Sequence, residues 1–251
     1  MRAYFESCLV VGRLLRGARY SNTRVVDDNG TLEVYKQRLP YAPILVALGD
    51  PLVWLLEAGM VVLSQSGWET RERLLYERLY GKLVRVERDA TLVLPHLPGR
   101  TLAALLDDAA LGRADRMEAI RLAVTSLAQF HALGYTHADA MAENVMVDLE
   151  TGGARWFDFE TVHDATRDTA WCRADDVRAL MATCLLRTPR VAFAEVVDRI
   201  LDDYGDKAVI PHVAASFAST TQRPLAFHLG QAPLSFESFQ EIGRMLNRRL
   251  S

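Results

Sequence analysis

Residues 127–148, LAQFHALGYTHADAMAENVMVD, and residues 156–160, WFDFE, decide the fold of this chain. Asp139 and Asn144 lie five residues apart on a loop that ends where the apolar run Val-Met-Val begins. Asp158 follows at the end of the next apolar run. A Gly-Gly turn separates the two runs, which predicts a hairpin, and a hairpin that returns on itself brings Asn144 and Asp158 side by side.

These three side chains predict a particular chemistry. Asn144 and Asp158 would present oxygen ligands to each other, and oxygen ligands suit a hard divalent ion such as Mg²⁺. Asp139 precedes the asparagine on the same loop and can face an incoming hydroxyl. The alternative interpretation is a capped turn beside two unrelated acids.

The same residues resemble the catalytic core of the protein-kinase-like superfamily, whose signature is H-R-D with a downstream Asn, followed by D-F-G. His137 begins the first motif, and Phe130-His131 resembles the Leu-His that ends the preceding helix in that superfamily. The resemblance implies an α+β, two-lobed protein-kinase-like fold with a short activation segment. A strand-rich N-lobe would cover about residues 1–96 and a mostly helical C-lobe about residues 99–251, within a single kinase-like domain, 1–251.

The resemblance also implies a nucleotide site in the N-lobe. Leu32-Glu33-Val34-Tyr35-Lys36 resembles the strand that carries the phosphate-binding lysine, so Lys36 is expected to contact ATP. Residues 17–23, GARYSNT, stand where the glycine-rich loop belongs but contain one glycine. Gly17, Ser21 and Thr23 are therefore expected to contact the phosphates through backbone N–H groups or hydroxyls.

Three further residues are expected to support the site by the same resemblance. Glu72 is the expected ion-pair partner of Lys36, with Glu69 and Glu77 as competitors. Asp176, in Arg-Ala-Asp-Asp-Val, is expected to be buried and to accept hydrogen bonds from the catalytic-loop backbone. His137 is expected to order that loop.

The chain departs from the family pattern in several places. Glu160 replaces the glycine of D-F-G, Met141 replaces the catalytic-loop lysine, and Ala138 replaces the arginine of H-R-D. Eighteen residues separate Asp158 from Asp176, which is short for a protein kinase. Regulation by phosphorylation of this segment is therefore not expected. The proportions, and residues 14–26, most resemble the compact Bud32, RIO and lipopolysaccharide (Kdo/heptose) kinase group.

Composition narrows the class of partner and the compartment. The net charge is −3, so no nucleic-acid partner is expected. The three cysteines, Cys8, Cys172 and Cys184, have no C-x-x-C spacing and indicate reduced thiols. With no signal-peptide pattern in the first residues, the chain is predicted to be cytoplasmic, with a peripheral contact at the inner membrane as a variant.

An apolar stretch, residues 43–63, has nearly the length of a membrane span. Asp50 and Glu57 lie near its middle, where charges are costly in a bilayer, so a buried helix followed by a strand is the favoured interpretation. A peripheral membrane or partner contact is the alternative. Residues 37–66 form an insertion relative to a minimal kinase, and their role is open.

Periodicity predicts a hairpin from two strands and a Gly-containing turn, residues 23–37, before a helix and a further strand. Asp115 is the predicted N-cap of the next long helix, and residues 206–235 are predicted to be rich in loops. The other predicted helices are Glu69–Tyr80, Arg173–Leu186, Val191–Tyr204 and Phe236–Leu250, and the other predicted strands are Thr91–Leu94, Asn144–Asp148 and Ala154–Phe157.

The predicted activity is transfer of the ATP γ-phosphoryl group to a hydroxyl, with ATP and Mg²⁺ as cofactors. The acceptor is either a saccharide or lipopolysaccharide, or a protein Ser/Thr. The alternative of another class is a nucleotide-binding pseudokinase that acts as an interaction module. All four residue types expected of a kinase site are present, which favours the enzyme.

Overall fold

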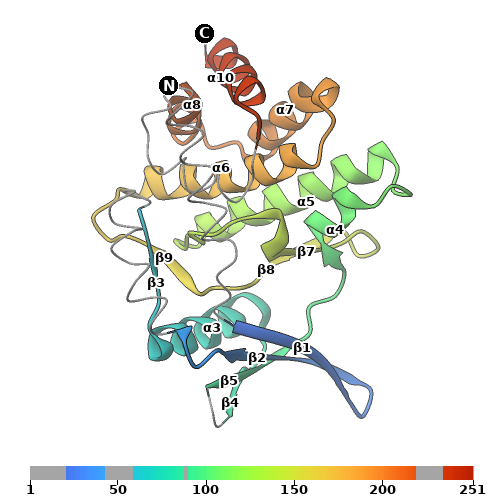
Figure 1. The fold of residues 1–251 in the computed structure, drawn as a ribbon, viewed down its shortest axis with the longest axis vertical. Helices are drawn as coiled ribbons and strands as arrows, with labels where there is room; N and C mark the ends of the chain where they lie inside the picture. Colours follow the sequence, from blue (N-terminus) through green and yellow to red (C-terminus); the bar gives the residue numbers. More distant parts are fainter. Residues whose placement is uncertain (1–20, 43–58, 88–89, 219–233, 251) are drawn as a thin grey trace.

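A computed structural model describes residues 21–42, 59–87, 90–218 and 234–250 (Figure 1). A sheet and one helix form the N-terminal lobe, and the other long helices form the C-terminal lobe (Figure 1). The α+β, two-lobed fold predicted from the sequence is confirmed. Gly17 and most of residues 43–63 lie outside the described residues.

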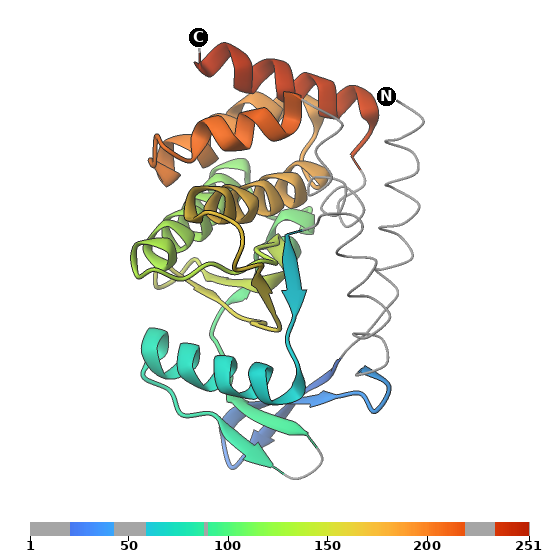
Figure 2. The same ribbon diagram turned by 90° about the vertical axis from the view of Figure 1, so that its left-hand side faces the viewer.

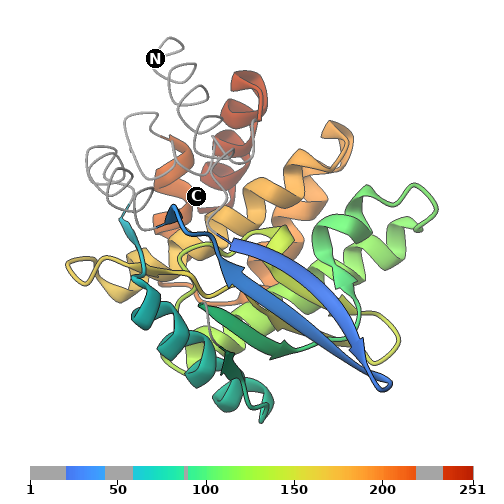
Figure 3. The same cartoon turned by 60° about the horizontal axis from the view of Figure 1, so that its bottom comes forward.

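The N-terminal lobe is built on a four-stranded antiparallel sheet of order β1-β2-β5-β4 (Figure 3). The predicted hairpin is present, from β1 (Ser21–Asp28) to β2 (Thr31–Arg38). Its turn residues Asn29 and Gly30 have φ values of 52° and 85°, as a tight two-residue turn between twisted strands requires. The remaining two strands are β4 (Arg85–Glu87) and β5 (Thr91–Pro95).

Helix α3 (Gln65–Tyr80) contributes buried residues to the core of this lobe. It begins four residues before the predicted start, because the Ser64 hydroxyl accepts a hydrogen bond from the Gly67 amide and caps it. A short strand, β3 (Met60–Val62), leads into this helix. The apolar stretch 43–63 therefore ends in a strand, as expected.

The two lobes are joined after β5 by an extended segment. It leads into β6 (Arg100–Thr101), α4 (Leu102–Asp107) and α5 (Arg113–Ala132). The N-cap prediction for Asp115 is wrong: Gly112 precedes the helix and Asp115 lies in its first turn. An acid there still suits the positive end of the helix dipole.

A three-stranded sheet of order β6-β7-β8 adjoins residues 137–144, which we call the catalytic loop after the motif that they resemble. The predicted second hairpin is present as β7 (Val145–Asp148) and β8 (Gly153–Trp156), preceded by a single 3-10 turn, η1 (Ala142–Asn144). The chain then forms β9 (Thr161–His163), which pairs with β3 of the N-terminal lobe. The two-stranded sheet formed by β3 and β9 lies between the lobes (Figure 2).

Helices make up the rest of the C-terminal lobe: α6 (Thr169–Leu186), the short η2 (Arg190–Ala192), α7 (Phe193–Tyr204), α8 (Ile210–Ala218) and α10 (Phe236–Leu250). The loop prediction for 206–235 is wrong in part, because α8 lies within it. Pro211 is the second residue of that helix, in the first turn, where a missing amide costs nothing.

One cluster of buried apolar side chains runs through both lobes, from Trp68 on α3 through Phe159 to Leu246 on α10. Cys172 and Cys184 are buried free thiols, as predicted. Among the described residues, no helix has both the length and the hydrophobicity needed to cross a membrane.

Candidate active site

Lys36 lies at the centre of a group of carboxylates. It is buried on β2, opposite Leu92 of β5. Its Nζ lies 2.5 Å from an oxygen of Asp158 and 2.9 Å from oxygens of both Glu72 and Glu160. Burial alone would lower the pKa of Lys36, but the three carboxylates outweigh it and hold the pKa well above its usual value. Lys36 is therefore a permanent cation in the cleft.

Glu72 of α3 is the ion-pair partner of Lys36, as expected. Its side chain is fully buried, and the same Oε1 also accepts hydrogen bonds from the Trp68 indole and the Phe159 amide. Glu69, one of the competitors, instead accepts a hydrogen bond from Gln65 on its own helix. Glu72 thus connects α3, the lysine strand and the D-F-E segment.

Asp176 lies beneath the catalytic loop, in the middle of α6, which begins four residues before the predicted start at Arg173. It is fully buried, and its two oxygens accept hydrogen bonds from the amides of His137 and Ala138 at 2.7 and 2.8 Å. His131 lies 2.9 Å from the same carboxylate. Burial would raise the pKa of Asp176, but three surrounding histidines, His163 first, and the hydrogen bond to His131 lower it. This is the geometry that the sequence predicted for Asp176.

The support matters because the loop backbone is strained. Ala138 has φ 67°, a left-handed conformation that costs a residue with a Cβ of order 1 kcal/mol. The two amides held by Asp176 lie at this position, so the carboxylate stabilises the bend. His137 is buried, its Nε2 lies 2.9 Å from the Phe157 carbonyl, and burial lowers its pKa to about 4.

Hydrogen bonds join Asp139 and Asn144, which lie five residues apart on this loop. The Asn144 amide donates both to the Asp139 backbone carbonyl, at 2.9 Å, and to its carboxylate, at 2.8 Å. The other carboxylate oxygen is buried and has no protein partner among the described residues. Burial, and then the charge of Asp158, raise the pKa of Asp139 to about 8, which suits a proton acceptor near neutral pH.

The hairpin brings Asp158 to this pair. Val145 pairs with Trp156, so Asn144 lies opposite Phe157, whose amide donates to the Asn144 carbonyl. Asp158 comes next and has φ 67°, which turns its side chain toward Lys36. Lys36 and Asp158 therefore meet between the lobes, and Asn144 and Asp139 lie on the loop that precedes the hairpin.

Phe159 packs beneath the site. Its ring stacks on Phe130 with centroids 5.8 Å apart and contacts His137 at 5.1 Å and Tyr76 of α3 at 6.4 Å. A fully buried ring of this size links α3 to the catalytic loop and makes the position of one depend on the other.

Glu160, which replaces a glycine of the family motif, has a defined place. It is buried, contacts Lys36 and accepts a hydrogen bond from the Ser21 hydroxyl at 2.8 Å. Ser21, predicted to contact phosphate, therefore contacts Glu160 in this structure. Sequence reasoning treated Glu160 only as a departure; its acidic character beside Asp158 was the available signal.

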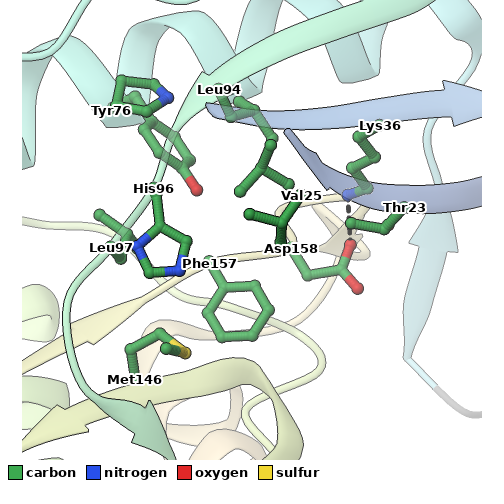
Figure 4. A pocket seen from close by; sticks show the side chains of 12 residues that line it. Thr23, Val25, Lys36, Tyr76, Leu94, His96, Leu97, Met146, Phe157 and Asp158 are labelled. Carbon is green, nitrogen blue, oxygen red and sulfur yellow. Dashed lines mark hydrogen bonds and ion pairs between the residues drawn. The ribbon is translucent and has the colours of Figure 1, made fainter. Parts of the chain in front are cut away.

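A cavity opens beside Lys36 and Asp158 between the lobes (Figure 4). Its polar end contains Lys36, Asp158 and the predicted residue Thr23, and its remaining wall is mostly apolar. Sequence reasoning missed that wall: Val25, Val34, Tyr76, Leu94, Pro95, His96, Leu97, Met146 and Phe157. Met146 and Phe157 are close in sequence to Asn144 and Asp158, and Pro95–Leu97 lies in the segment that joins the lobes.

The donor set fits a hard cation with few protein ligands. Asp158 offers a partly exposed carboxylate, and the Asn144 side-chain oxygen remains available because its amide nitrogen bonds Asp139. No group of three or more His, Cys, Asp or Glu residues suited to a metal is present in the described part of the chain. Two oxygen ligands suit Mg²⁺, which keeps water and substrate phosphate as its other ligands.

Comparisons with known proteins add little to this geometry. No protein-family model and no curated protein matches the chain. One similar solved structure is Rad53 1-466 in complex with AMP-PNP, with 13% sequence identity and a TM-score of 0.37. The match covers 91% of this chain and 57% of that one. The protein-kinase-like character of the site therefore rests on the residues and contacts described above.

Proposed function

We propose that this protein is an ATP-dependent phosphotransferase that moves the γ-phosphoryl group of ATP to a hydroxyl. One observation carries the proposal: a buried Lys36–Glu72 ion pair contacts Asp158, with Asn144 and Asp139 beside it, at the polar end of an apolar interlobe cavity. A mostly apolar cavity with a lysine at one end suits a nucleotide, whose base is aromatic and whose phosphates are anionic.

Each side chain has a role that follows from its charge and place. Lys36 neutralises phosphate charge, and Glu72 keeps it oriented. Asp158 and Asn144 would hold Mg²⁺, which supplies charge stabilisation of the transferring group when bound. Asp139 orients the acceptor hydroxyl and takes its proton late, since phosphoryl transfer proceeds through a loose transition state.

The Ser21–Glu160–Lys36 contacts occupy the place where phosphates would lie. Nucleotide binding would require Lys36 to exchange at least one carboxylate for phosphate. Because Glu72 is fully buried and Asp158 and Glu160 are less so, the exchange is expected at the latter two. Thr23 and Ser21 then become available to the phosphates.

The acceptor is proposed to be either a saccharide or lipopolysaccharide, or a protein Ser/Thr. The Bud32/RIO/lipopolysaccharide kinase resemblance supports both. A pseudokinase that binds nucleotide without transfer is the competing proposal. The Oδ1 atom of half-buried Asp139 favours the enzyme, since it has no protein partner among the described residues and a ligand hydroxyl would satisfy it.

The test uses γ-labelled ATP with Mg²⁺ and a cell lysate separated into protein, saccharide and lipid fractions. Wild-type protein is compared with Asp158→Ala and with Asp115→Ala, an exposed acid on α5 that serves as the matched control. Transfer of label that the Asp158 variant loses by more than ~100-fold and the control keeps would support the proposal. ATP binding without any transfer would establish the pseudokinase instead.

A further inference from the structure

Strand β3 crosses between the lobes and leads directly into α3 (Figure 2). Only Leu63 and Ser64 separate the end of β3 from the first residue of α3, and Ser64 caps the helix. Any displacement of β3 is therefore transmitted to the helix that carries Glu72. The chain thus joins the lobes a second time, apart from the segment after β5.

The strand that pairs with β3 is β9, which follows the D-F-E segment, residues 158–160. Met60, Val61 and Val62 pair antiparallel with His163, Val162 and Thr161. Two backbone hydrogen bonds extend the ladder at its ends: the Leu63 amide donates to the Glu160 carbonyl, and the Asp164 amide to the Gly59 carbonyl, both at 2.9 Å. We call this pair of strands, residues 59–64 with 160–164, the strap.

The strap is anchored on the C-terminal lobe at Gly59. This residue has φ 69°, and a Cβ at its position would lie 2.3 Å from the Trp171 indole. Trp171 belongs to α6 and packs edge-on against His163 of β9, with centroids 6.0 Å apart. The indole therefore contacts both strands of the strap, and only a glycine permits the approach.

The strap connects to the catalytic loop as well. On α3, Arg71 donates to the Thr136 carbonyl at 2.7 Å, next to Glu72. On β9, the Thr161 hydroxyl donates to the His137 carbonyl at 3.4 Å, and His163 contacts the Thr136 hydroxyl at 2.9 Å. Helix α3 and the β9 strand of the strap thus both contact the loop segment that precedes Asp139.

We propose that the strap, anchored by Trp171 on Gly59, positions Glu72 on Lys36 and so keeps the site assembled without phosphorylation of the D-F-E segment. Trp171 and Gly59 are positioning residues that act through α3. As a statement about phosphotransfer this rests on the proposed function, but the positioning itself is measurable without catalysis. Hydrogen bonds between β3 and β9 fix the segment after D-F-E, as a phosphate bound by an arginine cluster does in kinases that are activated by phosphorylation.

The test substitutes Gly59→Ala, whose Cβ would collide with the indole. The matched control is Gly152→Ala, at φ 70° in the β7–β8 turn, where a Cβ meets no atom within 4 Å. The two glycines have nearly the same φ, so the collision with Trp171 is the difference that the comparison isolates. Trp171→Leu, alone and combined with Gly59→Ala, completes a double-mutant cycle.

The readout is acylation of Lys36 by an amine-reactive reagent, mapped by mass spectrometry. Lys82 and Lys207 are the other two lysines of the chain and serve as internal references. Gly59→Ala is expected to speed Lys36 labelling by about fivefold or more, because local opening of the strap exposes the pair. Gly152→Ala is expected to leave it unchanged.

The double variant is expected to label no faster than the faster single variant, since both changes break one contact. Circular dichroism verifies folding, and if Gly59→Ala does not fold, Trp171→Leu alone gives the answer. Unchanged Lys36 labelling in folded variants, or strictly additive effects, would overturn the proposal. Faster labelling with no phosphotransfer by the wild type would support the strap and reject the proposed function.

Discussion

Two buried side chains, Asp176 and His137, lose their contact with water in the folded protein and need polar partners to offset that loss. Asp176 is an anion without solvent contact, and it is tolerable because two loop amides and His131 surround it. His137 is buried in the neutral state. The sequence marked both as supports, on resemblance alone; their hydrogen bonds supply the physical reason.

Removing the Asp176 carboxylate should destabilise the fold. Asp176→Ala leaves the amides of His137 and Ala138 buried without acceptors, at about 1–3 kcal/mol each. We expect a fall in the free energy of unfolding of several kcal/mol, measured by urea denaturation. Asp115→Ala, which removes an exposed acid from the first turn of α5, should cost no more than about 1 kcal/mol. Equal stability of the two variants would contradict the role of Asp176.

His137 should make the protein acid-sensitive. Its folded pKa of about 4 is below the usual 6.5, so the unfolded chain binds the proton first as pH falls. The contribution of His137 to stability should therefore decline between about pH 6.5 and pH 4, against the opposite contribution of Asp139, whose raised pKa favours the folded state as pH falls. His137→Asn should be less stable than wild type at pH 7.5 but have a shallower pH slope in that window, measured by thermal unfolding. Parallel slopes for the two proteins would show that another group titrates.

At the scale of elements, contacts with three other parts of the chain define the position of α3. Its N-terminus continues from β3, Glu72 reaches Lys36, and Tyr76 contacts Phe159. The helix itself was predictable from its periodicity, but its partners were not, because they lie 36 and more residues away along the chain.

Substitutions along α3 should distinguish Glu72 from its competitors. Glu72→Gln removes the buried charge that orients Lys36, and we expect kcat/KM for ATP to fall by more than about tenfold. Glu77→Gln changes an exposed acid on the same helix and should have little effect. Nucleotide affinity measured by calorimetry provides the check if turnover is slow. A larger loss in the Glu77 variant would reverse the assignment.

At the scale of the whole molecule, the segment between Glu160 and α6 is short, and part of it is already fixed by pairing with another strand. Residues 161–163 pair with β3, and Asp168 caps α6. In the sequence, Ala138 rather than an arginine precedes Asp139. We expect phosphatase-treated protein, shown by mass to carry no phosphate, to transfer phosphoryl without a lag. A lag that disappears after pre-incubation with ATP would show that the segment switches.

The two described thiols should be nearly inert in the native state. Burial raises the pKa of both Cys172 and Cys184 to about 12, so the thiolate fraction at pH 8 is roughly one in ten thousand. Alkylation followed by mass mapping should modify them only after unfolding. Rapid modification of either residue at pH 8 in folded protein would show local opening of α6.

The sequence by itself determined the features that depend on neighbouring residues. The β1–β2 turn follows from Asn29-Gly30, whose positive φ angles few other pairs adopt, and the β7–β8 hairpin brings Asn144 to Asp158 through strand register. The amphipathic face of α10 predicted its bounds, Phe236–Leu250. Local geometry decides such features, so local sequence predicts them.

The tertiary structure alone decided which distant groups meet. A strand edge such as β3 has the same pattern whichever edge it pairs with, and its partner β9 lies about a hundred residues further along. The contacts of Glu160 with Ser21 and Lys36, and of Gly59 with Trp171, are likewise long-range. These contacts depend on exclusion of water and on close packing. Both conditions arise only in the folded protein, where the two lobes enclose the site.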